Sequence, residues 1–376
     1  MPFFFSMVVA FMLLFLTGTA TFYMKLIPKK RILRIVSVAM MVVINLGTVW
    51  FMVNKMSETD GFIYRACMFL ATLCFVVNIY GAVFFLISLI VRLSCRIVKK
   101  KDSKVAVFLR GKYFRLCVLS FTVLLGIAGY INMSIVNVRD YDVYTDKLPA
   151  GKEYTFAVIT DMHLSTGVYA GRVDDLFEKI NDTGCDAVLF VGDIADNKTS
   201  KAAYDELRKA LGTLKCPLGA FYADGNHDDS GSQNMRVLMT NAGVKVLSDE
   251  KYELTPEITI YGRNDPRSFR GGRTKIPTDL SDEKFNLIMT HQPVNLSLFA
   301  DAGADLSVSG HTHGEQFPLM YPIIAASNDA VMGHDSIDGM DVIVSRGVGG
   351  WGLHFSLPSP KEIALVHVIS EVDYDR

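Results

Sequence analysis

The 376-residue sequence lacks several features by which common protein classes are recognised. Its six cysteines form no Cys-x-x-Cys pair and no zinc-finger spacing, which argues against a disulfide framework and a cysteine-based metal site. The formal net charge is −1 and no basic face stands out in the polar part of the chain, so no nucleic-acid partner is indicated. Within the first 138 residues, long stretches contain no charged residue at all.

Those charge-free stretches are long enough to cross a bilayer. A hydrocarbon core of about 30 Å requires about 20 helical residues at a rise of about 1.5 Å each. The stretches are Phe3–Met24, Ile35–Asn54, Ala66–Val91 and Leu116–Val138. We interpret the first as a retained span, because no basic region precedes its apolar run and no small-residue cleavage site follows. The sequence therefore predicts an all-α transmembrane region of four helices over residues 1–138 and a linker over 139–152.

The distribution of Lys and Arg between the short loops predicts the orientation of these helices. The first loop carries five such residues and the third nine, whereas the second carries only Lys55 and Arg65. Basic loops remain in the cytoplasm. We therefore expect a multi-pass protein of the cell (plasma) membrane, with everything after about residue 138 outside the cytoplasm. Because the spans contain no ionisable side chain, an anchor is favoured over a transporter.

After Gly151, short apolar runs alternate with polar segments of helical periodicity such as Arg172–Asp182 and Lys201–Leu214. Strand–helix–strand alternation predicts a parallel sheet in an α/β domain over residues 153–370. Beyond residue 250, strands follow one another with fewer helices between them, which predicts a second sheet packed against the first.

Five of the predicted strands end in polar residues that can bind metals. In open α/β sheets, ligands bind at the carboxyl ends of the strands. Seven such side chains, one carboxylate bridging, would fill two metal sites, and their mixture of oxygen and imidazole groups favours Mn, Fe or Zn. Two-metal sites clamp the oxygens of a phosphorus centre. The seven are Asp161, His163, Asp193, Asn226, His291, His311 and His313.

The order of these motifs resembles the calcineurin-like metallophosphoesterases. The blocks are Asp161-Met162-His163, Gly192-Asp193, Gly225-Asn226-His227-Asp228, His291 and Gly310-His311-Thr312-His313. The chain is most similar to the membrane-anchored bacterial branch, in which Gly310–Gln316 and Ser345-Arg346-Gly347 have counterparts. Glu315 replaces the glycine usual before Gln316, which would change the local charge near the substrate.

The resemblance implies a fold of two packed β-sheets flanked by helices. It implies one metal bound by Asp161, His163, Asp193 and His313, and a second bound by Asp193, Asn226, His291 and His311. His227 would donate a proton to the leaving oxygen or stabilise the pentacoordinate phosphorus. Asp228 would either hold the His227 ring or cap a helix. Arg346 is either a phosphate ligand or a surface arginine.

We therefore expect hydrolysis of phosphate esters that depends on two metal ions, with phosphodiesters or pyrophosphates favoured. The predicted partners are a phosphorylated small-molecule or lipid substrate, related to the envelope, and the membrane itself. The alternative is a non-catalytic membrane receptor or scaffold that binds metal or a phosphorylated ligand.

Several other residues have weaker claims to a functional role. Arg263–Arg267 forms either a loop near the site or an ordinary turn. Cys185 and Cys216 are either a disulfide pair or buried small side chains. The remaining histidines are interpreted as structural: His334, His354 and His367.

Overall fold

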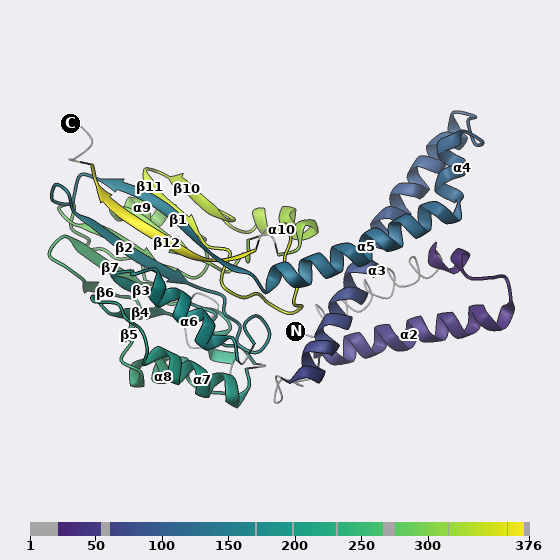
Figure 1. The fold of residues 1–376 in the computed structure, drawn as a ribbon. Helices are drawn as coiled ribbons and strands as arrows, with labels where there is room; N and C mark the ends of the chain where they lie inside the picture. Colours follow the sequence, from purple (N-terminus) through teal and green to yellow (C-terminus); the bar gives the residue numbers. More distant parts are fainter. Residues whose placement is uncertain are drawn as a thin grey trace. The chain divides into compact units, whose positions relative to one another are not determined.

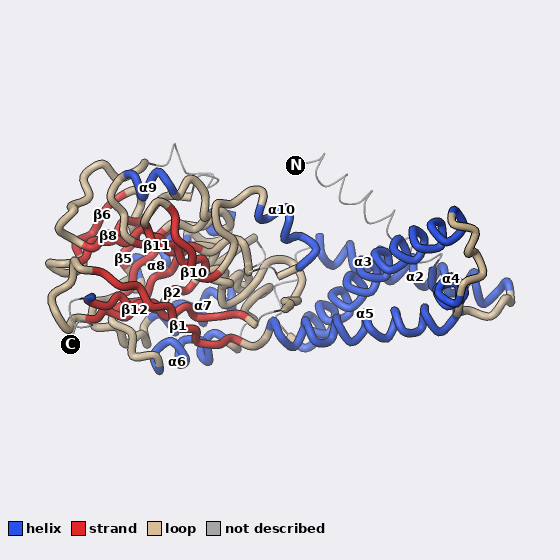
Figure 2. The backbone as a smooth tube through the Cα atoms, turned by 90° about the horizontal axis from the view of Figure 1, so that it is seen from above, coloured by secondary structure: helices blue, strands red, loops and turns tan. Residues whose placement is uncertain are grey.

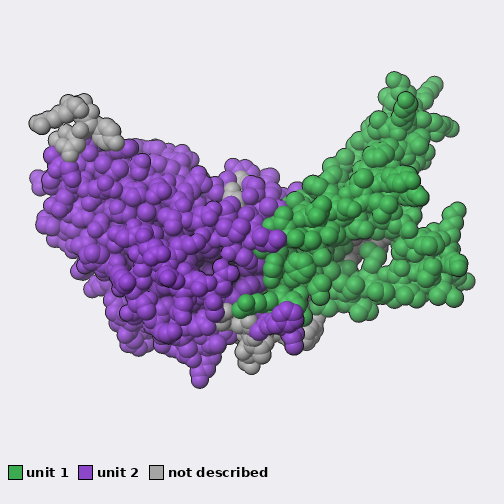
Figure 3. Space-filling model, viewed as in Figure 1, with its two compact units in different colours: residues 1–54, 65–130 green, residues 55–64, 131–376 purple. Residues whose placement is uncertain are grey.

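The computed structural model describes residues 22–53, 61–169, 171–197, 199–230, 232–265, 275–314, 316–358 and 360–371. The chain divides into two compact units (Figure 3). The N-terminal unit comprises residues 1–54 and 65–130, and the C-terminal unit comprises residues 55–64 and 131–376.

The described part of the N-terminal unit is helical. It contains η1 (Met24–Leu26), α2 (Arg31–Val53), α3 (Phe62–Ile97), α4 (Lys104–Arg110) and α5 (Lys112–Met133), although the first residues of α3 and the last of α5 belong to the C-terminal unit. Within the described residues, α3 and α5 are the two helices long and apolar enough to cross a membrane. The predicted stretch Ile35–Asn54 falls almost entirely in α2, and Phe3–Met24 lies outside the described residues except for its last three. A four-span region therefore remains a prediction.

Polar side chains in these helices bond to neighbouring elements, as expected for asparagines in apolar helices. The side-chain nitrogen of Asn78 on α3 donates to the side-chain oxygen of Asn45 on α2 over 2.7 Å. Unpaired amides are costly away from water, so this bond links the two helices.

The end of α5 corrects two predictions. The helix stops at Met133, and residues predicted as the end of the last span and the first half of the linker form strand β1 (Val136–Thr145). β1 pairs in parallel with β12 (Lys361–Ser370) along ten residues. Its side chains alternate, with Tyr141, Val143 and Thr145 buried and their neighbours exposed. This period of two is typical of a strand and cannot continue a helix.

The C-terminal unit contains two six-stranded sheets (Figures 1 and 2). The first has the order β1-β12-β2-β3-β4-β5. Its remaining strands are β2 (Glu153–Ile159), β3 (Ala187–Val191), β4 (Ala220–Ala223) and β5 (Lys245–Val246). The helices that follow these strands or precede β5 are α6 (Val173–Asp182), α7 (Lys201–Leu211), η3 (Asp228–Ser230) and α8 (Met235–Asn241).

The second sheet has the order β10-β11-β9-β8-β7-β6. Its strands are β6 (Glu250–Glu253), β7 (Ile258–Gly262), β8 (Phe285–Met289), β9 (Leu306–Ser309), β10 (Gly333–Ile337) and β11 (Met340–Val344). Only short helical segments accompany it: α9 (Ser297–Asp301), η4 (Pro318–Met320) and α10 (Tyr321–Ala325). This confirms that helices become sparse after residue 250.

The two sheets pack face to face. One buried cluster joins Phe156, Leu189 and Phe221 of the first sheet to Leu287 and Val308 of the second. A second cluster lies between the first sheet and helices α6, α7 and α8. The predicted fold of two packed sheets flanked by helices is thus confirmed for this unit. Strands β2, β3 and β4 run parallel in one sheet and β7, β8 and β9 in the other, so their carboxyl ends gather the residues that follow them.

Candidate metal centre

The predicted metal ligands all lie just after the carboxyl ends of five strands. Asp161 and His163 follow β2, and Asp193 follows β3. Asn226 follows β4, His291 follows β8, and His311 and His313 follow β9.

The backbone at these positions is unusual for residues other than glycine. Five of the seven have a positive φ: Asp161 (55°), His163 (41°), Asp193 (54°), His311 (69°) and His313 (55°). A left-handed conformation costs about 1–3 kcal/mol for such a residue and tends to persist at functional sites. Two glycines allow the close approach of these turns, because a Cβ at Gly225 would overlap Asp193 and one at Gly310 would overlap Asp161.

The side chains form two groups of three, each suited to hold a cation. The ligand atoms of Asp161, His163 and His313 all lie within 4.8 Å of one another, as do those of Asp193, His291 and His311. Asp193, a member of the second group, also lies close to the first. Its Oδ2 is 3.6 Å from Nε2 of His163 and 3.1 Å from Nε2 of His291.

Six of the seven predicted ligands present a buried polar atom without a hydrogen-bond partner in the described structure. A buried polar atom is normally hydrogen-bonded, because leaving one unpaired costs free energy. Six such atoms around one centre fit cations that they would ligate. They are Asp161 Oδ1, His163 Nε2, Asp193 Oδ2, Asn226 Oδ1, His291 Nε2 and His313 Nδ1.

One imidazole ring, that of His291, is oriented by a hydrogen bond at its outer nitrogen, and a second, that of His163, has a carboxylate near its outer nitrogen. Nδ1 of His291 lies 2.9 Å from the carbonyl oxygen of Val191, which makes Nδ1 the donor and leaves the Nε2 lone pair for a metal. Nδ1 of His163 lies 3.5 Å from Oδ2 of Asp196. Burial lowers the pKa of His291, but the carboxylates of Asp193, Asp161 and Asp265 together raise it well above its usual value. A cation at Nε2 therefore competes with a proton, and metal affinity should fall at low pH.

Asp228 has a different role from either one predicted. Its carboxylate accepts hydrogen bonds from the backbone N–H groups of Gly225, Asp193, Ile194 and Ala195 and from the Tyr222 hydroxyl, over 2.8–3.0 Å. It therefore holds the turn that carries Asp193, and η3, which it begins, is only three residues long. Burial and the neighbouring Asp193 carboxylate raise the pKa of Asp228, and the backbone N–H groups oppose this rise.

His227 lies beside the two groups but belongs to neither. Its backbone N–H donates to Oδ1 of Asp193 over 2.8 Å. The centroid of its ring is 5.2 Å from that of His163 and 6.0 Å from that of Trp351. Burial lowers the pKa of His227. The ring therefore lies between the His163 side of the centre and the loop of Trp351.

Arg346 is not an exposed surface residue. Its side chain is 15% exposed, its Nε lies 3.9 Å from Oε2 of Glu362, and its backbone N–H donates to Oε1 of the same residue. It packs beside Gly314, where a Cβ would overlap it. Arg346 thus lies next to the turn of His313. Glu315, the departure from the family pattern, lies outside the described residues.

Sequence reasoning missed three residues around the centre. Nζ of the fully buried Lys361 donates to the carbonyl oxygens of His313 and Arg346, and burial lowers its pKa to about 8. No sequence signal marks a single lysine at the start of an apolar strand. Asp196, three residues after Asp193, could have been noticed as a second acidic residue in one turn. Trp351 stands alone in a glycine-rich loop.

The structure shows where Arg263, Asp265 and the two cysteines Cys185 and Cys216 lie. Arg263 is buried and donates to the carbonyl oxygen of Val294 over 3.0 Å. The Asp265 carboxylate accepts from Gln292, the neighbour of His291, so this loop borders the centre, while residues 266 and 267 lie outside the described part. Cys185 and Cys216 are both free cysteines.

The three remaining histidines each have a partner in the fold. Nε2 of His334 lies 2.6 Å from Oδ1 of Asp341, and Nε2 of His354 lies 2.9 Å from Oγ of Ser134. His367 lies between Asp140 and Glu153, at 3.0 and 2.9 Å. These contacts support structural roles.

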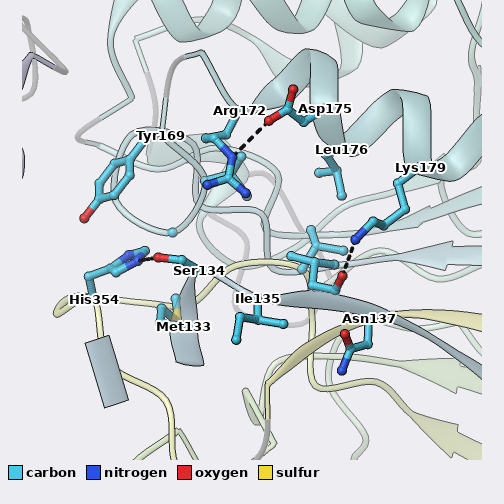
Figure 4. A pocket seen from close by; sticks show the side chains of 14 residues that line it. Met133, Ser134, Ile135, Asn137, Tyr169, Arg172, Asp175, Leu176, Lys179 and His354 are labelled. Atoms are coloured by element: carbon cyan, nitrogen blue, oxygen red, sulfur yellow. Dashed lines mark hydrogen bonds and ion pairs between the residues drawn. The ribbon is translucent and has the colours of Figure 1, made fainter. Parts of the chain in front are cut away.

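A separate cavity of about 190 Å³ lies between the start of β1 and helix α6 (Figure 4). None of the predicted metal ligands lines it. Its two cations are engaged, since Arg172 pairs with Asp175 over 3.2 Å and Lys179 donates to the carbonyl oxygen of Val136 over 2.6 Å. The cavity is therefore not part of the candidate centre.

The sequence model of the family described as calcineurin-like phosphoesterase matches residues 154–315. This chain has a calcineurin-like metallophosphoesterase domain. The matched residues include every predicted metal ligand and His227, whereas Arg346, Trp351 and Lys361 lie beyond them.

Individual relatives agree with this assignment. An uncharacterized metallophosphoesterase of Campylobacter jejuni is 29% identical over 288 residues, covering 74% of this chain and 75% of its own. A transmembrane protein with metallophosphoesterase domain from Danio rerio is 25% identical, covering 66% of this chain and 62% of its own. A crystal structure of a Danio rerio dimetal phosphatase aligns with 52% of this chain and 88% of its own, at 14% identity and a TM-score of 0.35.

The chain is therefore a metallophosphoesterase, a hydrolase of phosphoric ester bonds. The family implies a dinuclear metal centre and a phosphorylated substrate. Helices α3 and α5, together with the transmembrane relative, indicate a membrane protein.

Proposed function

We propose that the seven side chains bind two metal ions and that the chain hydrolyses phosphodiesters or pyrophosphates of membrane-proximal molecules, lipid or envelope precursors among them. One ion would be held by Asp161, His163, Asp193 and His313. The other would be held by Asp193, Asn226, His291 and His311. The observation that carries this proposal is the convergence on one centre of six buried ligand atoms that have no hydrogen-bond partner in the described structure.

Bound metal ions would supply a water molecule that is deprotonated near neutral pH and would neutralise phosphate oxygens. The protein supplies the rest. His227, whose pKa is lowered by burial, is poised to hold and release a proton at its ring nitrogen. General acid catalysis of this kind contributes about 10²–10⁴-fold to the rate. Asp228 keeps the Asp193 turn in place through hydrogen bonds from three consecutive backbone N–H groups, and it accepts two more from Gly225 and Tyr222.

Arg346 is proposed to bind a substrate phosphate. It lies beside Gly314 in the loop that carries His313, and a guanidinium group matches the geometry of phosphate oxygens. For the metals we favour Mn, Fe or Zn, because four of the seven ligands are imidazoles and the hard cations Mg²⁺ and Ca²⁺ prefer oxygen ligands.

The experiment that tests this function is purification of the full chain, metal analysis, and assay against phosphomonoesters, phosphodiesters, nucleotide pyrophosphates and lipid phosphates. We expect two metal equivalents and metal-dependent turnover, with diesters or pyrophosphates preferred. Bound metal without turnover of any substrate would contradict the enzyme mechanism and favour a receptor or scaffold.

We also propose that residues 1–133 anchor the chain by four spans and that the metallophosphoesterase domain lies outside the cytoplasm. The support is the concentration of Lys and Arg in the first and third loops. Protease added to intact cells should digest the C-terminal domain. Digestion only after lysis would show the opposite orientation.

A further inference from the structure

Several large apolar side chains are exposed in the segments that follow the His313 turn and strand β11. They are carried by η4 and α10 and by the glycine-rich loop after β11. We call them the apolar rim; their exposed fractions are Leu319 44%, Met320 45%, Tyr321 41%, Ile323 62% and Trp351 53%. Soluble surfaces rarely concentrate such side chains without a partner to cover them.

One member of the rim, Trp351, lies beside His227 at the centre. η4 begins five residues after His313, and the Trp351 ring lies 6.0 Å from the ring of His227. The two segments that carry the rim are joined by Gln316, whose side chain donates to the carbonyl oxygens of Trp351 and Leu353 over 3.1 and 2.9 Å. Phe317 stacks on Phe355 with centroids 5.1 Å apart. These contacts therefore hold together the two segments that carry the rim.

The loop that carries Trp351 is also hydrogen-bonded to the end of α5, one of the two candidate membrane spans. Asn132, which belongs to the C-terminal unit, donates to the carbonyl oxygens of Ser356 and Pro358 over 3.0 and 3.4 Å. Oγ of Ser134 lies 2.9 Å from Nε2 of His354. The rim segments are therefore fixed to the residues at which the chain leaves that span.

Charge is absent from all three segments that meet here. No Asp, Glu, Lys or Arg occurs in residues 131–138, 316–328 or 347–360. A surface that contacts soluble proteins usually has a polar or charged border. An uncharged apolar surface that contains Trp and Tyr is instead typical of a segment in the bilayer interface, where such rings lie at headgroup depth.

We infer that the apolar rim docks on the lipid bilayer that the chain crosses, so that the entrance to the metal centre faces the membrane surface. The apolar side chains would enter the boundary between headgroups and acyl chains, to a depth of about 5–10 Å. This is a second contact with the membrane, made by the catalytic domain itself. It concerns the position of the site and not its chemistry.

Fluorescence of Trp351 in the full chain tests this inference. The chain has two tryptophans, so Trp50→Phe leaves Trp351 as the single reporter. The protein is reconstituted in phosphatidylcholine vesicles, with or without lipids brominated near the headgroup end of the acyl chains. We expect emission from Trp351 to be strongly quenched by the brominated lipid.

The comparison that decides is between two further variants in the Trp50→Phe background. Leu319→Ser/Met320→Ser/Ile323→Ser removes three rim side chains. Its matched control, Val237→Ser/Leu298→Ser, removes exposed apolar side chains of α8 and α9, which are 53% and 47% exposed. The rim variant should lose most of the quenching and the control should keep it. Equal quenching in both, or no quenching in the parent, overturns the inference.

Hydrolysis of a water-soluble chromogenic phosphodiester separates this result from the proposed function. Both variants should retain the parent's turnover of that substrate, because neither changes a residue of the metal centre. A parent that shows quenching without turnover would contradict the proposed function and leave the docking inference supported. A rim variant that loses quenching because it forms fewer dimers, as measured by cross-linking, would instead show that a second copy covers the rim.

Discussion

Nε2 of His291 lies 3.1 Å from Oδ2 of Asp193, while Nδ1 of the same ring lies 2.9 Å from the carbonyl oxygen of Val191. His291 comes from the second sheet, whereas Val191 and Asp193 come from the end of β3 in the first. One strand end therefore supplies a carboxylate ligand and also orients a histidine from the opposite sheet. The centre depends on the packing of the two sheets as well as on its ligands.

Asp193→Asn should remove the residue placed between the two ligand groups. The amide has no negative charge and only one oxygen, so it cannot bridge two cations as a carboxylate can. We expect the metal content to fall below two per chain and phosphodiester hydrolysis to be lost. Mass-spectrometric metal analysis and an assay at saturating metal measure the two effects. Full activity in this variant would refute Asp193 as the bridging ligand.

His227→Ala should separate catalysis from metal binding. His227 lies outside both ligand groups, so the metal content should not change. The kcat should fall by about 10²–10⁴-fold, the usual contribution of a general acid. The loss should be smaller for substrates with a good leaving group, which need less protonation. Loss of metal together with activity would instead make His227 a ligand.

Asp228→Asn should destabilise the Asp193 turn. Five donors point at this carboxylate, and an amide would turn an NH₂ group toward some of them. Each buried donor left unpaired costs about 1–3 kcal/mol. We expect a lower unfolding midpoint and weaker metal binding. Tyr222→Phe removes only one of the five donors and is the matched control, with an expected cost of about 0.5–1.5 kcal/mol.

His367 should make stability depend on pH away from the metal centre. It joins β12 to β1 and β2 through Asp140 and Glu153. Burial lowers the pKa of His367, but hydrogen bonds to these two carboxylates raise it above the usual value. The stabilisation is therefore fully present below about pH 6.5, the unfolded pKa, and is lost as pH rises through the higher folded pKa.

Thermal unfolding of the parent and of His367→Gln at several pH values measures this effect. The difference in midpoint should be largest at acidic pH and should nearly vanish at alkaline pH. The opposite trend, or a constant difference, would show that the charge of His367 does not carry the effect. His334→Gln serves as a comparison, because its ring pairs with only Asp341.

Removal of metal should also lower stability. Ligands that bind only the folded state stabilise it by mass action. A chelator should therefore abolish hydrolysis and lower the unfolding midpoint, and Mn²⁺ or Zn²⁺ should restore both. The chelator should leave the midpoint of Asp193→Asn nearly unchanged if that variant holds little metal.

The sequence by itself determined the strands that carry the centre and the residues that follow them. The apolar run Ala187–Val191 coincides with β3, and the polar residues after it are the ones found at the centre. Such features are local: an apolar strand and the glycine or aspartate that ends it lie within a few residues, and parallel strands bring their carboxyl ends to one edge.

Other features depend on partners distant in the sequence. β1 was missed because its first residues continue an apolar span without a break, and its strand character follows from pairing with β12, more than 200 residues later. The Asp228 carboxylate binds N–H groups 33–35 residues away, which no motif spacing reveals. Lys361, the first residue of β12, reaches the centre through bonds to the loops of His313 and Arg346, and Trp351 reaches it through its contact with His227. The packing of the two sheets determines which donor meets which acceptor. Only the tertiary structure therefore decided these contacts.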